Sequence, residues 1–292
     1  MKKIISVIVA FSLTMAFGLC AFADEPIVDT SHVYMYQEMV DDMKALSEKY
    51  PTVSYSEVGK SASGQPIYEI TLGNPNASHN VFIVSSLHAS EYQNTLLMMD
   101  LIEDAAPNYT ADVCYYIIPM ANPDGIFISQ SGQYPKWKAN GIGIDINRNF
   151  PAGFGNNSSS APGYAFYAGP APFSATEAVA VNNLLTARKY DCAISYHQQG
   201  QIIIYASYPC TPDVTYRGLC LVQGLSAMTG YKPTLDAAPN GGMAEYANTM
   251  LNIPTVTIET GTKSPNPVSA YPKVYKQNKN LFAIVNNIVS AW

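Results

Sequence analysis

Along most of this chain, apolar runs of strand length alternate with segments whose apolar residues recur at helical spacing. Repeated alternation of this kind predicts an α/β fold. The expected strands are 53–58, 67–72, 81–87, 114–119, 192–196, 202–206 and 255–258, and the expected helices are 36–49, 91–104, 174–189, 213–229, 241–250 and 273–290. A stretch rich in Gly, Asn and Ser at 153–163 predicts a long surface loop.

The first 23 residues have the features of a secretory signal peptide. Lys2 and Lys3 precede an apolar stretch, and Ala21-Phe22-Ala23 has the small-x-small pattern of a cleavage site. We therefore expect a secreted protein, in which residues 24–292 form one domain with a full core. The alternative is an uncleaved membrane anchor, because the apolar stretch is nearly long enough to span a bilayer. The cleavage site favours export, with no stable membrane insertion after cleavage.

Composition and charge exclude some classes of function. Apolar residues make up 48% of the chain, which excludes a disordered protein. Once Lys2 and Lys3 are set aside, 14 basic residues stand against 22 acidic ones, a net charge of −8. A protein with this balance is a poor partner for nucleic acid or for an anionic surface. We expect no nucleic-acid partner, and a basic or neutral substrate is easier to accommodate.

Four cysteines follow the signal segment, and none of them has the C-x-x-C spacing of a metal site. Cys114 and Cys192 fall in apolar runs and are expected to be buried strand residues. Cys210 and Cys220 flank a turn and the start of a helix. In an exported protein they either form a local disulfide or remain free thiols, and the spacing does not decide between the two.

Residues with metal-binding chemistry follow the expected strands. His88 and Glu91 come directly after one strand, at a spacing that lets both side chains reach one ion. Of the four histidines in the chain, only His197 also follows an apolar, strand-like run. Two His and one Glu leave a zinc ion one open position for water, which is a recurrent set for peptide hydrolysis. By itself His-x-x-Glu is weak evidence, because it is common by chance and Glu is favoured at helix N-termini.

Two further polar residues, Asn122 and Glu259, also stand at the ends of expected strands. Open α/β sheets bind ligands outside the carboxyl ends of their strands, so these two and the histidines are expected to gather at one edge. Glu259 follows an apolar run in which a carboxylate is costly to bury without a purpose. The alternative for Glu259 is a structural acid paired with a lysine.

Several segments, in this order along the chain, resemble the zinc carboxypeptidase family typified by carboxypeptidase A. They are His88-x-x-Glu91, Asn122-Pro123-Asp124-Gly125, 143–150, Ser195-Tyr196-His197 and 257–261. The resemblance covers nearly all of residues 24–292 and implies a catalytic domain with a mixed, twisted sheet flanked by helices. It implies one Zn²⁺ held by His88, Glu91 and His197, with water in the fourth position. Glu259 would then be the general base that passes a proton to the leaving amine.

The resemblance also assigns residues that bind the substrate and support the ligands. Asn147 and Arg148 match the pair that grips a substrate carboxylate, a task that suits the two-pronged guanidinium group. Asp145 is expected behind a ligand histidine, most simply His88, where it accepts a hydrogen bond and fixes the tautomer. The alternative for Asp145 is an ordinary turn aspartate.

Two positions depart from the digestive members of the family. Their oxyanion-stabilising arginine follows a tryptophan, whereas Lys138 follows Trp137 here and keeps the charge without the fork. The tyrosine that they close over the substrate has no match around Ala237, which leaves Tyr231 and Tyr246 as unassigned substitutes.

The segments 137–140 and 197–201 resemble more closely the bacterial branch that cuts γ-D-glutamyl-diamino acid bonds in peptidoglycan stem peptides. The expected substrate is therefore a γ-D-glutamyl-meso-diaminopimelate bond. One alternative is a general extracellular carboxypeptidase, with side-chain preference set around 241–246, either apolar through Met243 and Ala244 or basic through Glu245. A remoter alternative is a non-catalytic binding protein on the same scaffold, which the presence of all three ligands and Glu259 disfavours.

Overall fold

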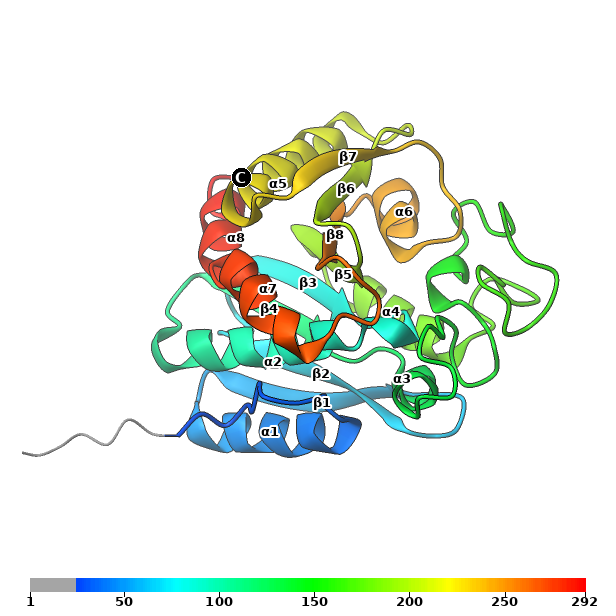
Figure 1. Ribbon diagram of the computed structural model, residues 1–292. Coiled ribbons are helices and arrows are strands. Elements are labelled where there is room, and N and C mark those ends of the chain that lie inside the picture. Colours follow the sequence, from blue (N-terminus) through cyan, green and yellow to red (C-terminus); the bar gives the residue numbers. More distant parts are fainter. Residues whose placement is uncertain (1–24) are drawn as a thin grey trace, which may run out of the picture.

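The computed structural model describes residues 25–292, so the expected signal peptide at 1–23 lies outside the described residues. Eight strands form one mixed sheet with helices on both faces (Figure 1). This arrangement confirms the expected α/β fold with a mixed sheet flanked by helices. Within the described residues, no helix has both the length and the apolar character needed to cross a membrane.

The elements follow the alternation seen in the sequence. The strands are β1 Val53–Lys60, β2 Pro66–Leu72, β3 His79–Ser85, β4 Val113–Ile118, β5 Cys192–Gln198, β6 Ile202–Ala206, β7 Lys232–Asp236 and β8 Thr255–Thr260. The helices are α1 Tyr36–Lys49, α2 Gln93–Ala105, α3 Pro123–Gln130, α4 Thr176–Ala187, α5 Pro212–Thr229, α6 Met243–Tyr246, α7 Tyr271–Asn278 and α8 Leu281–Val289. Short helical turns include η1 Ala89–Glu91, η3 Ile146–Arg148 and the π-turn η4 Ala247–Leu251.

The strand order is β1-β2-β4-β3-β5-β8-β6-β7, and the four central strands β4, β3, β5 and β8 are parallel. Their carboxyl ends therefore meet at one edge of the sheet. In the register of β5 and β8, His197 lies directly beside Glu259. The sheet thus brings together residues that are far apart in the sequence.

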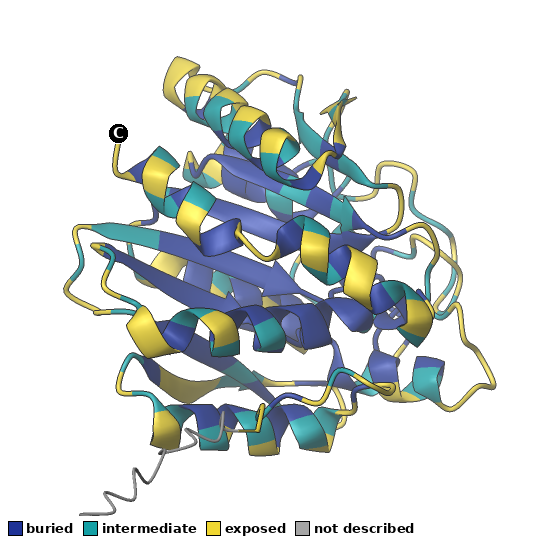
Figure 2. Ribbon diagram, turned by 60° about the vertical axis from the view of Figure 1, so that its left-hand side comes forward, coloured by how far each residue is buried: buried dark blue, intermediate teal, exposed yellow. Residues whose placement is uncertain are grey.

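The sheet separates two apolar cores. In β3, Val81 and Ile83 face the core that contains α1, α2, α5, α7 and α8, while Phe82 and Val84 face the core that contains α4 and α6. All four side chains are fully buried. Figure 2 shows the buried sheet between helices whose outer faces are exposed. Burial on both faces explains why these strands appear in the sequence as continuous apolar runs.

Three expected helices differ in detail from the structure. The helix expected over 273–290 is two helices, because Asn280 leaves the helical conformation at φ −98° and ψ 14°. The helix expected over 91–104 begins with the separate turn η1 before α2. The helix expected over 241–250 is the short α6 followed by the π-turn η4.

Two elements were not expected from the sequence. Helix α3 has a cap signal, because Asn122 accepts a hydrogen bond from the backbone N–H of Gly125 and a proline occupies the first turn. Its apolar residues do not fall on one stripe, so the periodicity was uninformative. Strand β7 is an edge strand that contains Pro233 and is mostly exposed, so it lacks the apolar alternation of a covered strand.

The cysteines and the Gly-rich stretch can now be placed. Cys114 and Cys192 are buried in β4 and β5, as expected. Cys210 and Cys220 are free thiols, so the structure contains no disulfide between them. The segment 153–163 contains no helix or strand, which agrees with the expected surface loop.

Candidate metal and substrate site

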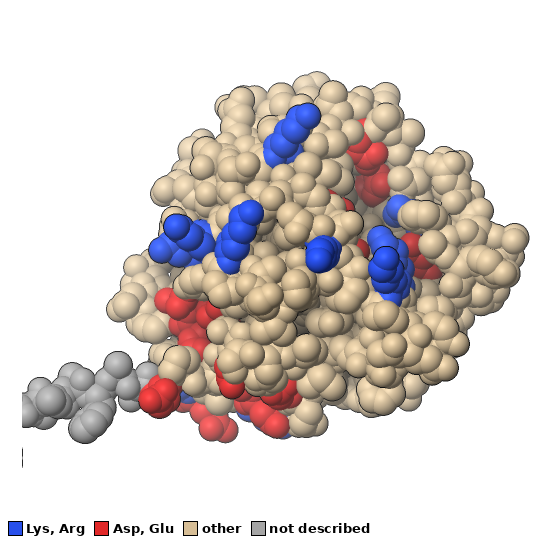
Figure 3. All heavy atoms as spheres, in the orientation of Figure 1, with Lys and Arg blue, Asp and Glu red and all other residues tan. Residues whose placement is uncertain are grey.

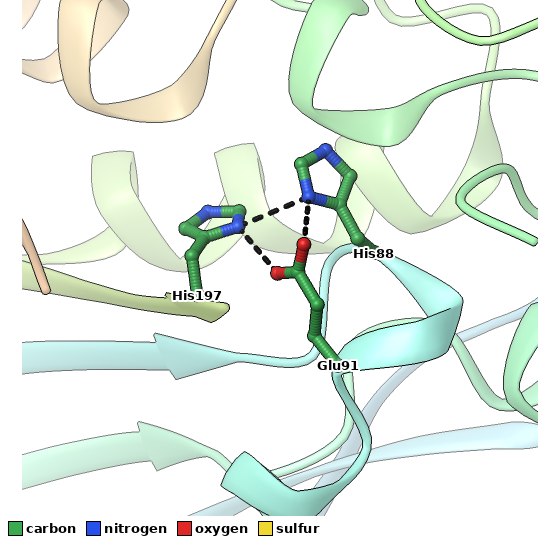
Figure 4. A group of neighbouring side chains, drawn as sticks. All are labelled: His88, Glu91 and His197. Carbon is green, nitrogen blue, oxygen red and sulfur yellow. Dashed lines mark hydrogen bonds and ion pairs between the residues drawn. The ribbon is translucent and has the colours of Figure 1, made fainter. Parts of the chain in front are cut away.

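Three side chains meet where β3 and β5 end. His88 immediately precedes the turn η1, Glu91 is the last residue of that turn, and His197 is the penultimate residue of β5. The Nδ1 atoms of His88 and His197 each lie 2.8 Å from a carboxylate oxygen of Glu91 and 3.2 Å from each other. Figure 4 shows the three side chains pointing toward one common position. The structure places His197 inside the strand rather than after it.

The turn that carries His88 is fixed by local contacts. Ser86 adopts a positive φ of 56°, which turns the chain out of β3. Its hydroxyl lies 2.9 Å from that of Thr95 in α2. The side chain of Asn122 donates hydrogen bonds to the carbonyl oxygens of Leu87 and Ala139. Asn122 therefore supports the chain beside the cluster and does not line the cavity described below, contrary to its expected place among the functional groups.

The cluster of His88, Glu91 and His197 fits a zinc ion. One donor atom from each residue lies within 4.8 Å of the others, and all three residues are buried. Two imidazole nitrogens and one carboxylate oxygen form a known zinc donor set. Burial by itself raises the pKa of Glu91, but His88 and His197 together have the larger effect and hold this pKa well below its ordinary value. The carboxylate is therefore ionised, as a metal ligand must be.

Asp145 lies behind the cluster, as the sequence predicts. Its Oδ1 is 3.2 Å from Nε2 of His88, on the side of the imidazole away from Glu91. The same oxygen accepts a hydrogen bond from the backbone N–H of Asn147 and so caps the turn η3. Asp145 is thus a turn aspartate that also contacts a histidine of the cluster. Such a contact fixes which nitrogen of the ring is available to a metal.

A cavity with a volume of about 180 Å³ opens beside the cluster. Its lining includes six of the predicted site residues, namely His88, Lys138, Asn147, Arg148, His197 and Glu259.

Burial, followed by repulsion from Glu91, raises the pKa of Glu259 to about 8. The Oε2 atom of Glu259 has no hydrogen-bond partner among the described residues. Lys138 Nζ lies 3.6 Å from Glu91 Oε1.

Asn147 and Arg148 are held at the cavity by the chain around α6. Asn147 lies 3.4 Å from Nε2 of His197 through its Nδ2, and its Oδ1 accepts a hydrogen bond from the backbone N–H of Met243. The Arg148 guanidinium stacks over the ring of Phe166. Gly241 has a φ of 88°, and a Cβ there would lie 2.4 Å from the carbonyl oxygen of Arg148. Only glycine allows this close approach.

The part of the cavity away from the metal cluster contains residues that the sequence did not predict to be there, among them Tyr205, Tyr208 and Asp236. Asp236 ends β7, which runs antiparallel to the central strands, so the rule of strand carboxyl ends would not have indicated it even if that strand had been recognised. Tyr205 belongs to the predicted strand 202–206, but nothing in the sequence shows which of its residues face the cavity. Tyr231 and Tyr246 do not line the cavity. Their hydroxyls donate hydrogen bonds to the side chains of Gln277 and Asn182.

The structure also shows which residue of 241–246 faces inward. Ala244 and Glu245 line the cavity, whereas Met243 is fully buried in the core. Burial, with a contribution from Asp236, raises the pKa of Glu245 to about 7. Gly242 leaves room for this side chain, since a Cβ there would lie 2.0 Å from Glu245 Oε2. The far part of the cavity is therefore acidic.

The fold and the His-Glu-His cluster define a zinc metallopeptidase. Residues 39–280, most of the chain, match the zinc carboxypeptidase family, and this protein belongs to that family. The match confirms the family resemblance expected from the ordered motifs.

Individual relatives agree with this assignment. The chain is 27% identical to γ-D-glutamyl-L-diamino acid endopeptidase 1 of Lysinibacillus sphaericus over 88% of this chain and 73% of that protein. Carboxypeptidase A from Helicoverpa armigera has a TM-score of 0.78 at 20% identity, covering 93% of this chain and 78% of that one. Murein-tripeptide amidase from Escherichia coli O157 has a TM-score of 0.57 at 20% identity, covering 81% and 92%. At these identities the two structures show a shared fold.

Proposed function

We propose that this protein is an exported peptidase that hydrolyses the γ-D-glutamyl-meso-diaminopimelate bond of peptidoglycan stem peptides. The observation that carries the proposal is the set of charges in the cavity, which holds Arg148 together with Asp236 and Glu245. Diaminopimelate as the leaving residue has a terminal carboxylate for Arg148 and a side-chain ammonium for the acids. The names of the Lysinibacillus relative and of the murein-tripeptide amidase support the same substrate class.

The roles of the residues follow from their places around the cluster. When bound by His88, Glu91 and His197, zinc supplies a Lewis acid and lowers the pKa of a coordinated water toward neutrality. Glu259 lines the same cavity, and its carboxylate can accept a proton from the attacking water and deliver it to the leaving amine.

Other polar groups around the cluster act on the substrate itself, on both sides of the scissile bond. The ammonium of Lys138, close to Glu91, stabilises negative charge that develops on the scissile carbonyl oxygen. Arg148 and Asn147 hold the carboxylate of the leaving residue. Hydrolysis by this arrangement needs no covalent bond between the enzyme and its substrate.

A general carboxypeptidase is the second candidate. Arg148 and Asn147 also suit the C-terminal carboxylate of an ordinary peptide, and the acids Asp236 and Glu245 would then favour a C-terminal Lys or Arg. The two candidates differ in the linkage on the acyl side of the scissile bond, which is γ in the stem peptide and α in an ordinary peptide.

Mass spectrometry of products separates the two candidates. Zinc-loaded protein (residues 24–292) is incubated with L-Ala-γ-D-Glu-meso-diaminopimelate and, separately, with the ordinary tripeptide L-Ala-L-Glu-L-Lys. Release of diaminopimelate from the first substrate alone is the expected result. Release of lysine alone would replace the proposal with the general carboxypeptidase. The Glu259→Gln variant serves as the control for contaminating peptidases.

A further inference from the structure

A second cleft, with a volume of about 340 Å³, adjoins the cavity at Lys138 and Glu259, which line both. Its other polar lining includes Lys136, Ser90 and Ser264. Lys136 stands one residue before Trp137 in the segment that leads to Lys138, and its side chain is exposed. We call this second cleft, between Lys136, Lys138 and Ser264, the lysine cleft.

The position of Arg148 fixes which part of a substrate can reach the lysine cleft. Arg148 and Asn147 line the first cavity and not the lysine cleft, so the leaving residue with its carboxylate occupies the first cavity. The scissile carbonyl must lie at the cluster, next to Glu259 and Lys138. The acyl residue then continues away from the first cavity, and the lysine cleft is the adjoining space that shares those two side chains.

The charges of the lysine cleft favour an anionic group. Lys136 makes no ion pair with any residue from 25 to 292, and the hydroxyls of Ser90 and Ser264 lie 2.8 Å apart. Glu259 is the one acidic residue in the lining that the structure describes, and it faces both spaces. On the face drawn in Figure 3, most acidic groups gather low, around α1, and basic groups lie above them. This acidic protein therefore still presents positive charge on the acyl side of its reaction centre.

We propose that Lys136, assisted by Lys138, binds a free carboxylate of the acyl residue, and that the natural ligand is the α-carboxylate of a γ-linked D-glutamyl residue. In that residue two methylene groups join the scissile carbonyl to the carbon that bears the free carboxylate. A neutral α-linked residue has no carboxylate in this place. The identity of the natural ligand rests on the function proposed above, whereas the carboxylate site itself does not.

The experiment compares kcat/KM for two substrates that differ in one group. They are L-Ala-γ-D-Glu-meso-diaminopimelate and the same peptide with its α-carboxylate converted to the amide. The zinc-loaded protein is expected to prefer the carboxylate roughly fivefold, as for a partly exposed ion pair, and the preference should shrink in high salt. In Lys136→Gln the ratio should fall close to one. Lys232→Gln, at an exposed lysine at the start of β7, is the matched control and should keep the ratio.

A second pair of substrates separates this inference from the proposed function. An α-linked glutamate carries its side-chain carboxylate at the same distance along the chain, so L-Ala-L-Glu-L-Lys is compared with L-Ala-L-Gln-L-Lys. If only these ordinary peptides are cleaved, the γ-glutamyl function fails while the Glu-to-Gln ratio still tests the lysine cleft. If no peptide is cleaved, calorimetric affinities for the same pairs replace the rates. A ratio near one in the unsubstituted protein, or a ratio that Lys136→Gln leaves unchanged, overturns the site.

Discussion

The metal cluster and the acidic part of the cavity are built in different ways. The cluster consists of buried side chains at the ends of central parallel strands, where each side chain contacts another at 2.8 to 3.2 Å. Asp236 and Glu245 instead come from the edge strand β7 and the short helix α6, and Asp236 is only partly buried. Central strands thus position the groups that bind zinc, whereas peripheral elements supply the acidic groups that we propose select the substrate.

The largest expected effect tests the cluster itself. His88→Ala removes one of three zinc donors, and the remaining pair cannot hold the ion at the same affinity. We expect the purified variant to lose stoichiometric zinc and measurable hydrolysis, as determined by metal analysis and peptide assay. One zinc per chain in this variant would mean that the metal site lies elsewhere. His79→Ala, at a histidine in β3 remote from the cluster, is the matched control.

Glu259→Gln separates metal binding from chemistry at the same edge of the sheet. The amide preserves the shape of the side chain but cannot accept a proton, so the rate should fall by about 10²–10⁴-fold. Zinc content and the circular dichroism spectrum should match those of the unsubstituted protein. Glu69→Gln, at a buried glutamate in β2 that pairs with Arg188, should keep the peptidase rate. Full activity in Glu259→Gln would remove this residue from the mechanism.

Asp145→Asn tests the support behind the cluster. Loss of the carboxylate weakens the orientation of His88, and we expect the affinity for zinc to fall by roughly 10–100-fold. Competition with a chromophoric chelator measures this change. The rate at saturating zinc should change less than in Glu259→Gln, because Asp145 does not line the cavity. Unchanged zinc affinity would leave Asp145 with its turn-capping role alone.

Glu245→Gln tests the acidic part of the cavity and has the smallest expected effect on rate. Its preference for an ammonium-bearing leaving residue over one with a neutral side chain should fall several-fold, because one carboxylate is lost. Paired assays with diaminopimelate and norleucine in the leaving position give this ratio. Glu48→Gln, on the exposed face of α1, is the control for loss of one negative charge. An unchanged ratio would exclude Glu245 from side-chain selection.

The same variant has a pH-dependent effect on stability. In the folded protein the pKa of Glu245 is raised from 4.5 to about 7, so the folded state holds this proton more tightly than the unfolded chain. The contribution of this proton to the free energy of unfolding is complete below pH 4.5 and is lost as the pH rises through 7. The total loss is about 3 kcal/mol. Glu245→Gln should therefore gain stability over the unsubstituted protein at pH 8.5 but not at pH 4, measured by urea unfolding. A gain that does not vary with pH would contradict this assignment.

The sequence determined the α/β fold and the members of the metal cluster. Strands buried on both faces must be apolar along their length, so the central strands were visible as runs, and parallel strands bring the residues at their carboxyl ends together. His88, Glu91, His197 and Glu259 could be found in this way. The break at Asn280 could not, because the helical spacing of apolar residues continues across it. The edge strand β7 could not, because it is mostly exposed and lacks a strong apolar pattern.

Only the tertiary structure decided what surrounds the cluster. Asn147 meets Met243 across 96 residues, and Gly241 packs against the backbone of Arg148, contacts that no local pattern reports. These contacts bring Glu245 into the cavity and keep Met243 out of it, although only one residue separates the two in the chain. Local apolar periodicity indicates which face of a helix or strand is buried. Whether a polar side chain points into a shared cavity depends on helices and strands that are distant in the sequence.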